Sequence, residues 1–191
     1  MRLPFENTSS FLKQSNITNL ELTNPSHIKV RDIFVFCCFT GLSYIDIKNL
    51  KHDDISIGIN GNTWIRKTRQ KTGGLSRIKL FKLTLDLLNK YRNDSPFVFP
   101  VSSNQNMNRI LKKITSISGI EKPLKMHMAR HTFATYALTK NVSTETISQM
   151  LGHKSIKSTE IYAKVVDSKI SVEMDVFSQS IPKEISLPKV G

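Results

Sequence analysis

The chain has 191 residues, with 28 Lys or Arg against 15 Asp or Glu, so its formal net charge at pH 7 is +13. This length is enough for one or two compact domains with their own cores. A hydrophobic content of 39% is too high for a disordered polybasic chain. The positive excess favours a polyanionic partner, nucleic acid before an anionic membrane surface. Because the sequence has no apolar leader and no run of about 18 apolar residues, we expect a cytoplasmic protein.

The two cysteines, Cys37 and Cys38, are adjacent within a strongly apolar run. Neighbouring cysteines in such a run are typical of small buried hydrophobic side chains rather than of a disulfide. We therefore expect two buried thiols and a reducing compartment.

The first predicted elements are helices. Residues 1–25 show no sustained period and end in a turn signal at 24–26, so we interpret them as a linker segment. The strongly apolar stretch 27–40 predicts a buried helix that Gly41 ends. Residues 42–50 keep helical spacing, so the two stretches together predict a helix pair.

The hydrophobic period then changes to alternation, which is typical of strands. Residues 55–59 alternate and are followed by a hairpin turn at 60–62. A second strand is predicted at 64–69, a second turn at 71–74 and a third strand at 76–80. This part of the chain is therefore predicted to be a three-stranded antiparallel sheet.

After the sheet the pattern returns to helices. Helical spacing and helix-end signals predict helices at 83–91, 104–117, 127–138 and 143–152. Residues 161–165 predict a last helical segment, which an amphipathic stretch to Phe177 and a tail follow. The fold class is therefore predicted to be mainly α with a small three-stranded antiparallel β-sheet.

His127, Arg130 and His131 form the most informative local cluster, because positions i, i+3 and i+4 share one face of a helix. A zinc site is one interpretation. However, the segment lacks the Glu of HExxH, an arginine repels a dication, and neither a carboxylate cluster nor a CxxC pair completes a site. We therefore expect no metal and favour an anion, since guanidinium pairs with phosphate oxygens and histidine transfers protons near neutral pH.

Further motifs follow in a fixed order. Leu151, Gly152 and His153 are followed by Tyr162, nine residues after the histidine. The ordered set also contains CFTGLSYID at 38–46, RQKTG at 69–73, FVFP at 97–100 and ARHTFAT at 129–135. Over about residues 27–175 the chain resembles the catalytic domain of the tyrosine recombinase (phage integrase) family, especially integrases of conjugative and mobilisable elements. The resemblance implies the catalytic-domain fold of the DNA breaking-rejoining enzymes.

The resemblance also implies a reaction. Tyr162 matches the nucleophile that attacks a DNA phosphodiester and leaves a 3′-phosphotyrosine and a free 5′-hydroxyl. Lys71, in the second turn of the sheet, matches the general acid for the 5′ oxygen. A phenol with a pKa of about 10 needs a cationic field or a base to react at neutral pH. The chemistry needs no metal and no nucleotide, so no cofactor is expected.

The positions that surround the phosphate follow from the same resemblance. Arg130 matches an arginine that holds the non-bridging phosphate oxygens. His127 and His153 match residues that donate hydrogen bonds to the phosphate and assist proton transfer. Asp46 matches an acidic residue that orients its neighbours, and His131 supports the site from behind.

Position 43 departs from the family pattern, in which an arginine follows ThrGlyLeu, because this chain has Ser43 there. We expect a cation from elsewhere to replace it. Arg69 is the first candidate, since side chains two apart on a strand share a face and Arg69 is two residues from Lys71. Arg31, in the helix that leads to the motif, is the competing candidate.

The implied function is site-specific cleavage and rejoining of DNA during integration or excision of a mobile element, in the cytoplasm of a bacterium and on its nucleoid. We divide the chain into a linker segment (1–25), a catalytic domain (26–177) and a C-terminal tail (178–191). The stretch 170–177 resembles the segment that packs onto a neighbouring protomer, which implies a tetramer on double-stranded DNA and a monomer in free solution. The separate N-terminal DNA-binding domains of the family are not visible in this sequence.

Three alternatives stay open at this point. A non-catalytic or disabled DNA-binding domain explains the charge and Ser43. A metal-dependent nuclease also uses basic residues and histidines, but it loses activity in EDTA. A type IB topoisomerase shares the phosphotyrosine chemistry and differs in not exchanging strands between two defined sites.

Overall fold

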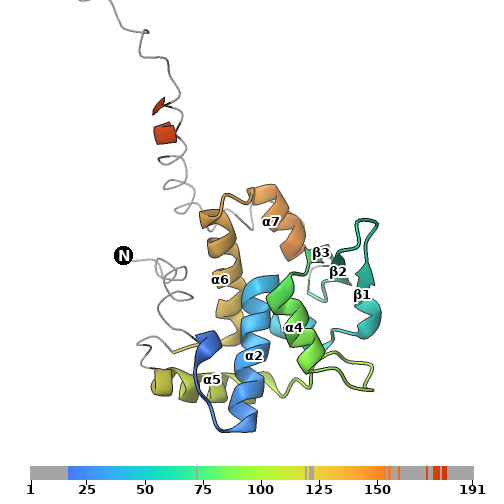
Figure 1. Cartoon of the computed structure of the whole chain (residues 1–191), viewed down its shortest axis with the longest axis vertical. Helices are drawn as coiled ribbons and strands as arrows, with labels where there is room; N and C mark the ends of the chain where they lie inside the picture. The colour runs from blue at the N-terminus through green and yellow to red at the C-terminus, as the bar shows by residue number, and fades with distance from the viewer. Residues whose placement is uncertain are drawn as a thin grey trace, which may run out of the picture.

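The structure is a computed structural model that describes residues 17–71, 73–118, 120, 123–153, 155, 159, 171, 174–176, 178 and 179. The elements are η1 (Ile17–Asn19), α2 (Pro25–Thr40), α3 (Tyr44–Lys48), η2 (His52–Asp54), β1 (Ile55–Ile57), β2 (Thr63–Thr68), β3 (Leu75–Lys79), α4 (Lys82–Lys90), α5 (Asn104–Ser118), α6 (Met126–Thr139) and α7 (Thr144–Leu151). Figure 1 shows helices gathered round α2 and the sheet at one side of the molecule, where β3 contacts α7. The predicted fold class is confirmed. In the described ranges no helix is long and apolar enough to cross a membrane.

Helix α2 packs against α4, α5, α6 and η1. The Asn24 side chain accepts two backbone hydrogen bonds from the first turn, and Pro25 occupies that turn, so the helix begins there. Gly41 ends it in the left-handed conformation, with φ of 68°. The predicted helix is confirmed, with its start moved from residue 27 to Pro25.

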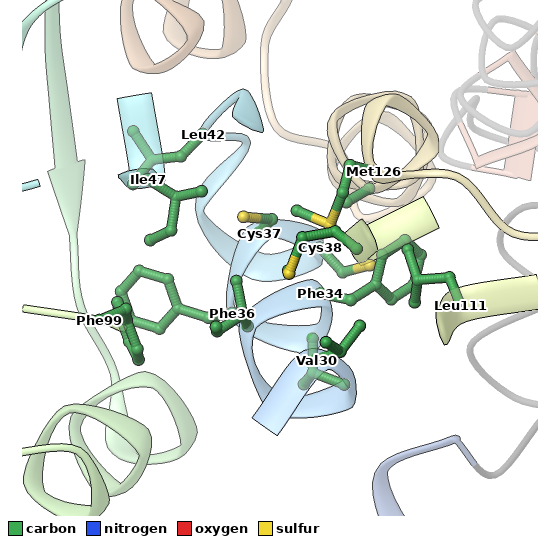
Figure 2. Close-up of a cluster of buried hydrophobic side chains, with 14 of the residues drawn as sticks. Val30, Phe34, Phe36, Cys37, Cys38, Leu42, Ile47, Phe99, Leu111 and Met126 are labelled. Atoms are coloured by element: carbon green, nitrogen blue, oxygen red, sulfur yellow. The ribbon is translucent and has the colours of Figure 1, made fainter. Parts of the chain in front are cut away.

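The hydrophobic core surrounds α2. Figure 2 shows side chains of this helix meeting Leu111 and Met126 on one side and Phe99 on the other. A helix covered on all sides is apolar around its whole circumference rather than along one stripe, which explains the continuous apolar run. Cys37 and Cys38 are free and fully buried, as predicted, and burial raises the pKa of both thiols.

The three strands pair in the order β1-β2-β3, with Ile65 directly opposite Ile78. Both side chains are fully buried, and the alternate residues of β2 and β3 face away from the core. The predicted hairpin turn contains Gly61, with φ of 71°. Strand β2 ends at Thr68, so Arg69 lies in the second turn and not in the strand as predicted.

The other predicted helices are confirmed with ends shifted by one or two residues. Helix α7 begins after Ser143, whose hydroxyl accepts a backbone hydrogen bond from the first turn, and ends at Gly152 with φ of 61°. The predicted segment 161–165 lies outside the described residues. Of the amphipathic stretch that follows it, residues 171 and 174–176 are described, and they are helical and exposed.

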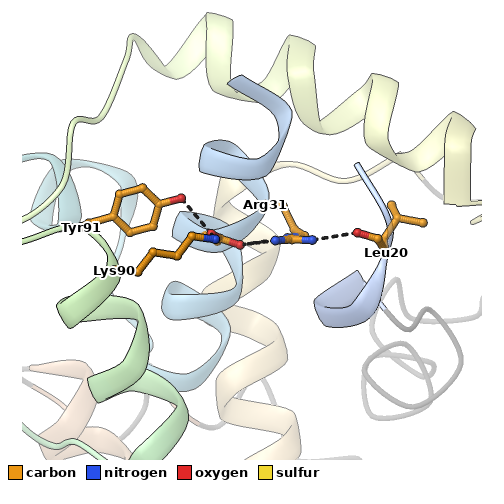
Figure 3. Close-up of polar contacts among 5 residues, drawn as sticks. Leu20, Arg31, Lys90 and Tyr91 are labelled. Carbon is orange, nitrogen blue, oxygen red and sulfur yellow. Dashed lines mark hydrogen bonds and ion pairs between the residues drawn. The ribbon is translucent and has the colours of Figure 1, made fainter. Parts of the chain in front are cut away.

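A polar network joins α2 to α4 and to the segment that precedes α2 (Figure 3). Asp32 is 4% exposed. Its carboxylate accepts from Lys90 Nζ at 2.7 Å and from the Tyr91 hydroxyl at 2.8 Å. Arg31 Nη2 lies 2.8 Å from the same carboxylate, and Arg31 Nη1 donates to the carbonyl of Leu20 at 2.8 Å. The buried negative charge of Asp32 is therefore compensated by two cations and one hydroxyl donor.

Candidate active site

Arg130, on α6, bridges the C-terminal ends of α2 and α7. Its Nη1 donates to the carbonyl of Gly41 and its Nη2 to the carbonyl of Leu151, both at 2.8 Å. Carbonyls at a helix end lack intrahelical donors and carry partial negative charge, which a guanidinium offsets. The half-buried Arg130 is therefore held where three helices meet.

The second turn of the sheet packs against the end of α7 at Gly152. A Cβ at Gly152 would lie 2.6 Å from Arg69 Cγ and 2.7 Å from Ser76 Oγ, so only glycine fits this position. A Cβ at Gly74, in the turn, would in the same way collide with the backbone of Gly152. This close approach places Arg69 beside the helix end that Arg130 also binds.

Arg69 is buried at this contact, with 5% of its surface exposed. Its Nη2 lies 3.0 Å from the carboxylate of Asp46 on α3, and Ser43 Oγ donates to the same carboxylate oxygen. The backbone N–H of Gln70 donates to the other oxygen at 3.3 Å. Among the described residues, Arg69 Nη1 has no hydrogen-bond partner although it is buried. Asp46 therefore fixes a guanidinium that still has donors to offer.

The prediction that Arg69 and Lys71 share a strand face is wrong. Arg69 is buried whereas Lys71 is exposed, so the two side chains do not share a strand face. Arg69 reaches the site because the chain turns after Thr68 and packs on α7. Burial lowers its pKa from the ordinary arginine value and the Asp46 carboxylate opposes that shift, so the group stays charged at neutral pH.

His153 follows α7 and is partly buried. Burial, together with the charges of Arg130 and Arg69, lowers the pKa of its imidazole to about 4. At pH 7 the ring is therefore neutral. Its Nδ1 lies 2.9 Å from the hydroxyl of the buried Thr159, which orients the ring. No motif or period in the sequence indicated Thr159, because this contact depends on the path of the chain after α7.

His127 and His131 lie on the same side of α6, as their spacing predicts. Their rings are perpendicular, with centroids 5.9 Å apart. His127 is exposed, and His131 is partly buried. Burial lowers the pKa of His131, and the neighbouring His127 and Arg130 add to this shift. The helix therefore presents the exposed imidazole of His127, and the partly buried imidazole of His131 lies next to it.

One predicted site residue, Arg31, is held in another part of the structure. Arg31 is wrong as a substitute for an arginine at position 43, because its guanidinium pairs with Asp32 and Leu20 in the network of Figure 3. Tyr162 lies outside the described residues. Within the part of the chain that the structure describes, no group of three or more His, Cys, Asp or Glu side chains is arranged to hold a metal ion.

The site combines several kinds of donor. Arg130 and Arg69 are charged, His153 is neutral at pH 7, and Lys71 is exposed on the turn that packs against them. Guanidinium groups form strong, charge-assisted hydrogen bonds to phosphate oxygens, and a neutral imidazole accepts a proton. The arrangement can therefore bind an anionic phosphodiester and stabilise charge that develops on it.

Known proteins resemble this chain over most of its length. The phage integrase family matches residues 2–169. Tyrosine recombinase XerD of Listeria monocytogenes serotype 4b is 30% identical over 186 residues, covering 87% of this chain and 59% of XerD. Tyrosine recombinase XerA of Pyrococcus furiosus is 30% identical over 159 residues, covering 76% and 54%. The chain thus spans somewhat more than half the length of these curated relatives.

Solved structures resemble it in fold. The XerH site-specific recombinase bound to palindromic difH substrate, in a post-cleavage complex, aligns with a TM-score of 0.68 at 21% identity, covering 93% of this chain and 53% of XerH. The catalytic domain of bacteriophage HP1 integrase aligns with a TM-score of 0.58 at 17% identity, covering 90% and 94%. The fold is therefore that of tyrosine recombinase catalytic domains.

Proposed function

Because the chain belongs to the phage integrase family, we propose that it is the catalytic part of a site-specific DNA recombinase that works through a 3′-phosphotyrosine. The meeting of Arg130, Arg69 and His153 at the end of α7 carries this proposal. Two guanidinium groups and a neutral imidazole in one place suit a phosphodiester, on which negative charge builds up during transfer.

In the proposed reaction the phenol oxygen of Tyr162 bonds to the scissile phosphorus, and the bond from phosphorus to the 5′ oxygen breaks. Lys71 gives a proton to the departing 5′ oxygen. The phenol proton passes to His153, which is neutral in the free protein and becomes more basic beside the bound anion. The reverse transfer rejoins the strands, and the phosphotyrosine keeps the bond energy, so no nucleotide is consumed.

The surrounding residues hold the phosphate in this scheme. Arg130 and Arg69 bind the non-bridging oxygens, and Arg69 uses its unpartnered Nη1 to do so. His127, exposed on α6, supplies a further hydrogen bond. Asp46 is a positioning residue for Arg69, and His131 supports the same helix face. Arg69 thereby takes the part that an arginine at position 43 plays in the family pattern.

The biological setting is part of the proposal. Its partner is double-stranded DNA, in line with the substrate-bound state of the XerH structure. We assign residues 26–177 to the catalytic domain, 1–25 to a linker segment and 178–191 to a tail. The stretch 170–177 joins protomers into a tetramer on DNA, and the reaction integrates or excises a mobile element in the bacterial cytoplasm.

A suicide-substrate assay tests the proposal. The protein is mixed with nicked duplexes that carry candidate recombination sites, and covalent adducts are resolved on denaturing gels with and without EDTA. We expect an EDTA-resistant adduct that is absent in Tyr162→Phe. The matched control is Tyr136→Phe on α6, whose partly buried ring packs on Phe39, and it should form the adduct normally.

Each alternative has its own outcome in this assay. A protein that binds the duplexes but forms no adduct is a DNA-binding domain without catalysis, and the proposal fails. Cleavage that disappears in EDTA indicates a metal-dependent nuclease. Adduct formation without exchange of strands between two sites indicates a topoisomerase.

A further inference from the structure

The outer face of the sheet is strongly basic. In the register of β2 and β3, Arg66 lies directly opposite Arg77, and Trp64 lies directly opposite Lys79. Residues directly opposite each other, and alternate residues along each strand, share a face. The three cations are exposed, whereas Ile65 and Ile78, on the other face, are fully buried. The sheet thus shows solvent a face with three positive charges and a partly buried indole.

The fold gains little from this arrangement beyond one exposed hydrogen bond, which Arg66 Nη1 donates to Ser56 Oγ at 3.3 Å. Like charges directly opposite each other on neighbouring strands destabilise a sheet. Among the described residues, none of the ion pairs includes Arg66, Arg77 or Lys79. The nearby Asp54 pairs instead with Lys67, which belongs to the opposite face. The three strands contain no acidic residue that could neutralise the face.

The basic face adjoins the turn that belongs to the candidate active site. Strands β2 and β3 lead directly into the turn that carries Arg69 and Lys71. Side chains on one face recur about every 7 Å along a strand, so the face extends about 14 Å from the turn. A duplex carries backbone charges every 3.4 Å of axis per strand, so this length corresponds to about four base pairs.

We propose that this outer face binds the phosphate backbone of the DNA that flanks the cleaved phosphodiester. The inference rests on the proposed function, because it takes the site at the turn to hold the scissile phosphate. The guanidinium groups of Arg66 and Arg77 lie on directly opposite residues. Each can form two charge-assisted hydrogen bonds to phosphate oxygens, which are stronger than hydrogen bonds to a neutral partner. Lys79 extends the contact, away from the turn. The flanking duplex then offsets the repulsion that the free sheet carries.

The test compares Arg66→Gln/Arg77→Gln with wild type on intact duplexes, all in a Tyr162→Phe background so that no cleavage interferes. Fluorescence anisotropy measures Kd between 50 and 200 mM salt, on a short duplex and on one extended by about ten base pairs on each side. We expect the slope of log K against log salt to fall by about 2 on the long duplex, at about 0.9 per lost phosphate contact. The Kd for that duplex should rise about tenfold, with a much smaller change on the short one.

A charge-matched control removes two exposed cations from the helical part of the molecule, as Lys29→Gln/Arg109→Gln. Its slope should stay close to that of wild type. An unchanged slope in the sheet variant, or an equal fall in the control, overturns the proposal. Polyglutamate serves as a probe for an acidic protein partner. If the sheet variant loses polyglutamate binding while its slope of log K against log salt for DNA is unchanged, the proposal is overturned in favour of such a partner.

Two further measurements show whether a change in DNA binding comes from lost stability or from a wrong proposed function. Urea unfolding should show that the sheet variant is at least as stable as wild type, because the repulsion between opposed arginines is removed. The adduct assay tests the proposed function alone, with Tyr162 present. A missing adduct therefore refutes the recombinase chemistry, whereas an unchanged salt slope refutes only the contact surface.

Discussion

Two buried aspartates, Asp32 on α2 and Asp46 on α3, each hold an arginine but leave it in different states. Asp32 binds Arg31, Lys90 and the Tyr91 hydroxyl, and the remaining side of Arg31 is taken by a backbone carbonyl (Figure 3). Asp46 binds Arg69, whose Nη1 is buried without a partner among the described residues.

The Asp32–Arg31 pair has the features of an ion pair that supports the fold. The Asp46–Arg69 pair has the features of one that holds an arginine ready to bind a ligand. A buried donor without a partner costs free energy, so a fold retains it where another demand is met. The Asp32 network closes on itself and joins helices. The Asp46 network keeps one guanidinium rigid and partly unsatisfied beside Arg130 and His153, which is what an anion site requires. We therefore expect the Asp32 network to affect stability and the Asp46 network to affect cleavage.

The largest effect on stability is expected for Asp32→Ala. The change leaves the partly buried Arg31 without its carboxylate, and we expect the free energy of unfolding to fall by about 3 kcal/mol. Urea unfolding measures this. Asp86→Ala removes an exposed partner of Lys82 on α4 and should cost less than about 0.5 kcal/mol. Cleavage per folded molecule should be unchanged in both variants, and a loss of cleavage in folded Asp32→Ala would contradict the comparison.

Arg69→Ala should abolish strand cleavage while DNA binding is retained. Arg69→Lys keeps the charge beside Asp46 but loses the planar fork, and its cleavage rate should fall about 100-fold, as for the loss of one transition-state donor. Single-turnover adduct formation measures both rates. Arg31→Lys makes the same exchange in the Asp32 network and should cleave at the normal rate. Near-normal cleavage by Arg69→Ala would remove Arg69 from the site.

Ser43→Ala should have a smaller effect. It removes one of the donors to Asp46 and leaves the pair with Arg69 intact. We expect the free energy of unfolding to fall by about 1 kcal/mol and the cleavage rate to fall several-fold, since Arg69 is held less firmly. If stability falls while the cleavage rate is unchanged, Ser43 supports only the fold.

The smallest effect concerns pH. The pKa of His153 is about 4 in the folded protein, below the ordinary histidine value, so between these two values the unfolded chain binds more protons than the folded one. Stability should therefore fall as pH drops from about 6.5 towards 4. In His153→Gln the decline should be less steep, with a remainder due to His131, whose pKa is also lowered. Urea unfolding at several pH values measures this, and equal flattening in His52→Gln, at an exposed position, would contradict the assignment.

Local signals in the sequence were enough to predict most elements of this fold. The alternation around Ile65 and Ile78 predicted the sheet, and Ser143 and Gly152 marked the ends of α7. The helical spacing of His127 and His131 placed both rings on one side of α6. Such features depend on residues within a few positions of each other, where backbone geometry alone decides which side chains meet.

The tertiary structure alone decided which of the two candidate arginines lies beside the end of α7 and His153. From the sequence, Arg69 was the first candidate and Arg31 the competing one, but the reason for preferring Arg69 was a strand that in fact ends at Thr68. Contacts between distant segments separated the two, because Arg31 closes on Leu20 and Asp32 whereas Arg69 packs on Gly152 and pairs with Asp46. Burial and hydrogen-bond partners are properties of the packed chain, and no local period in the sequence carries them.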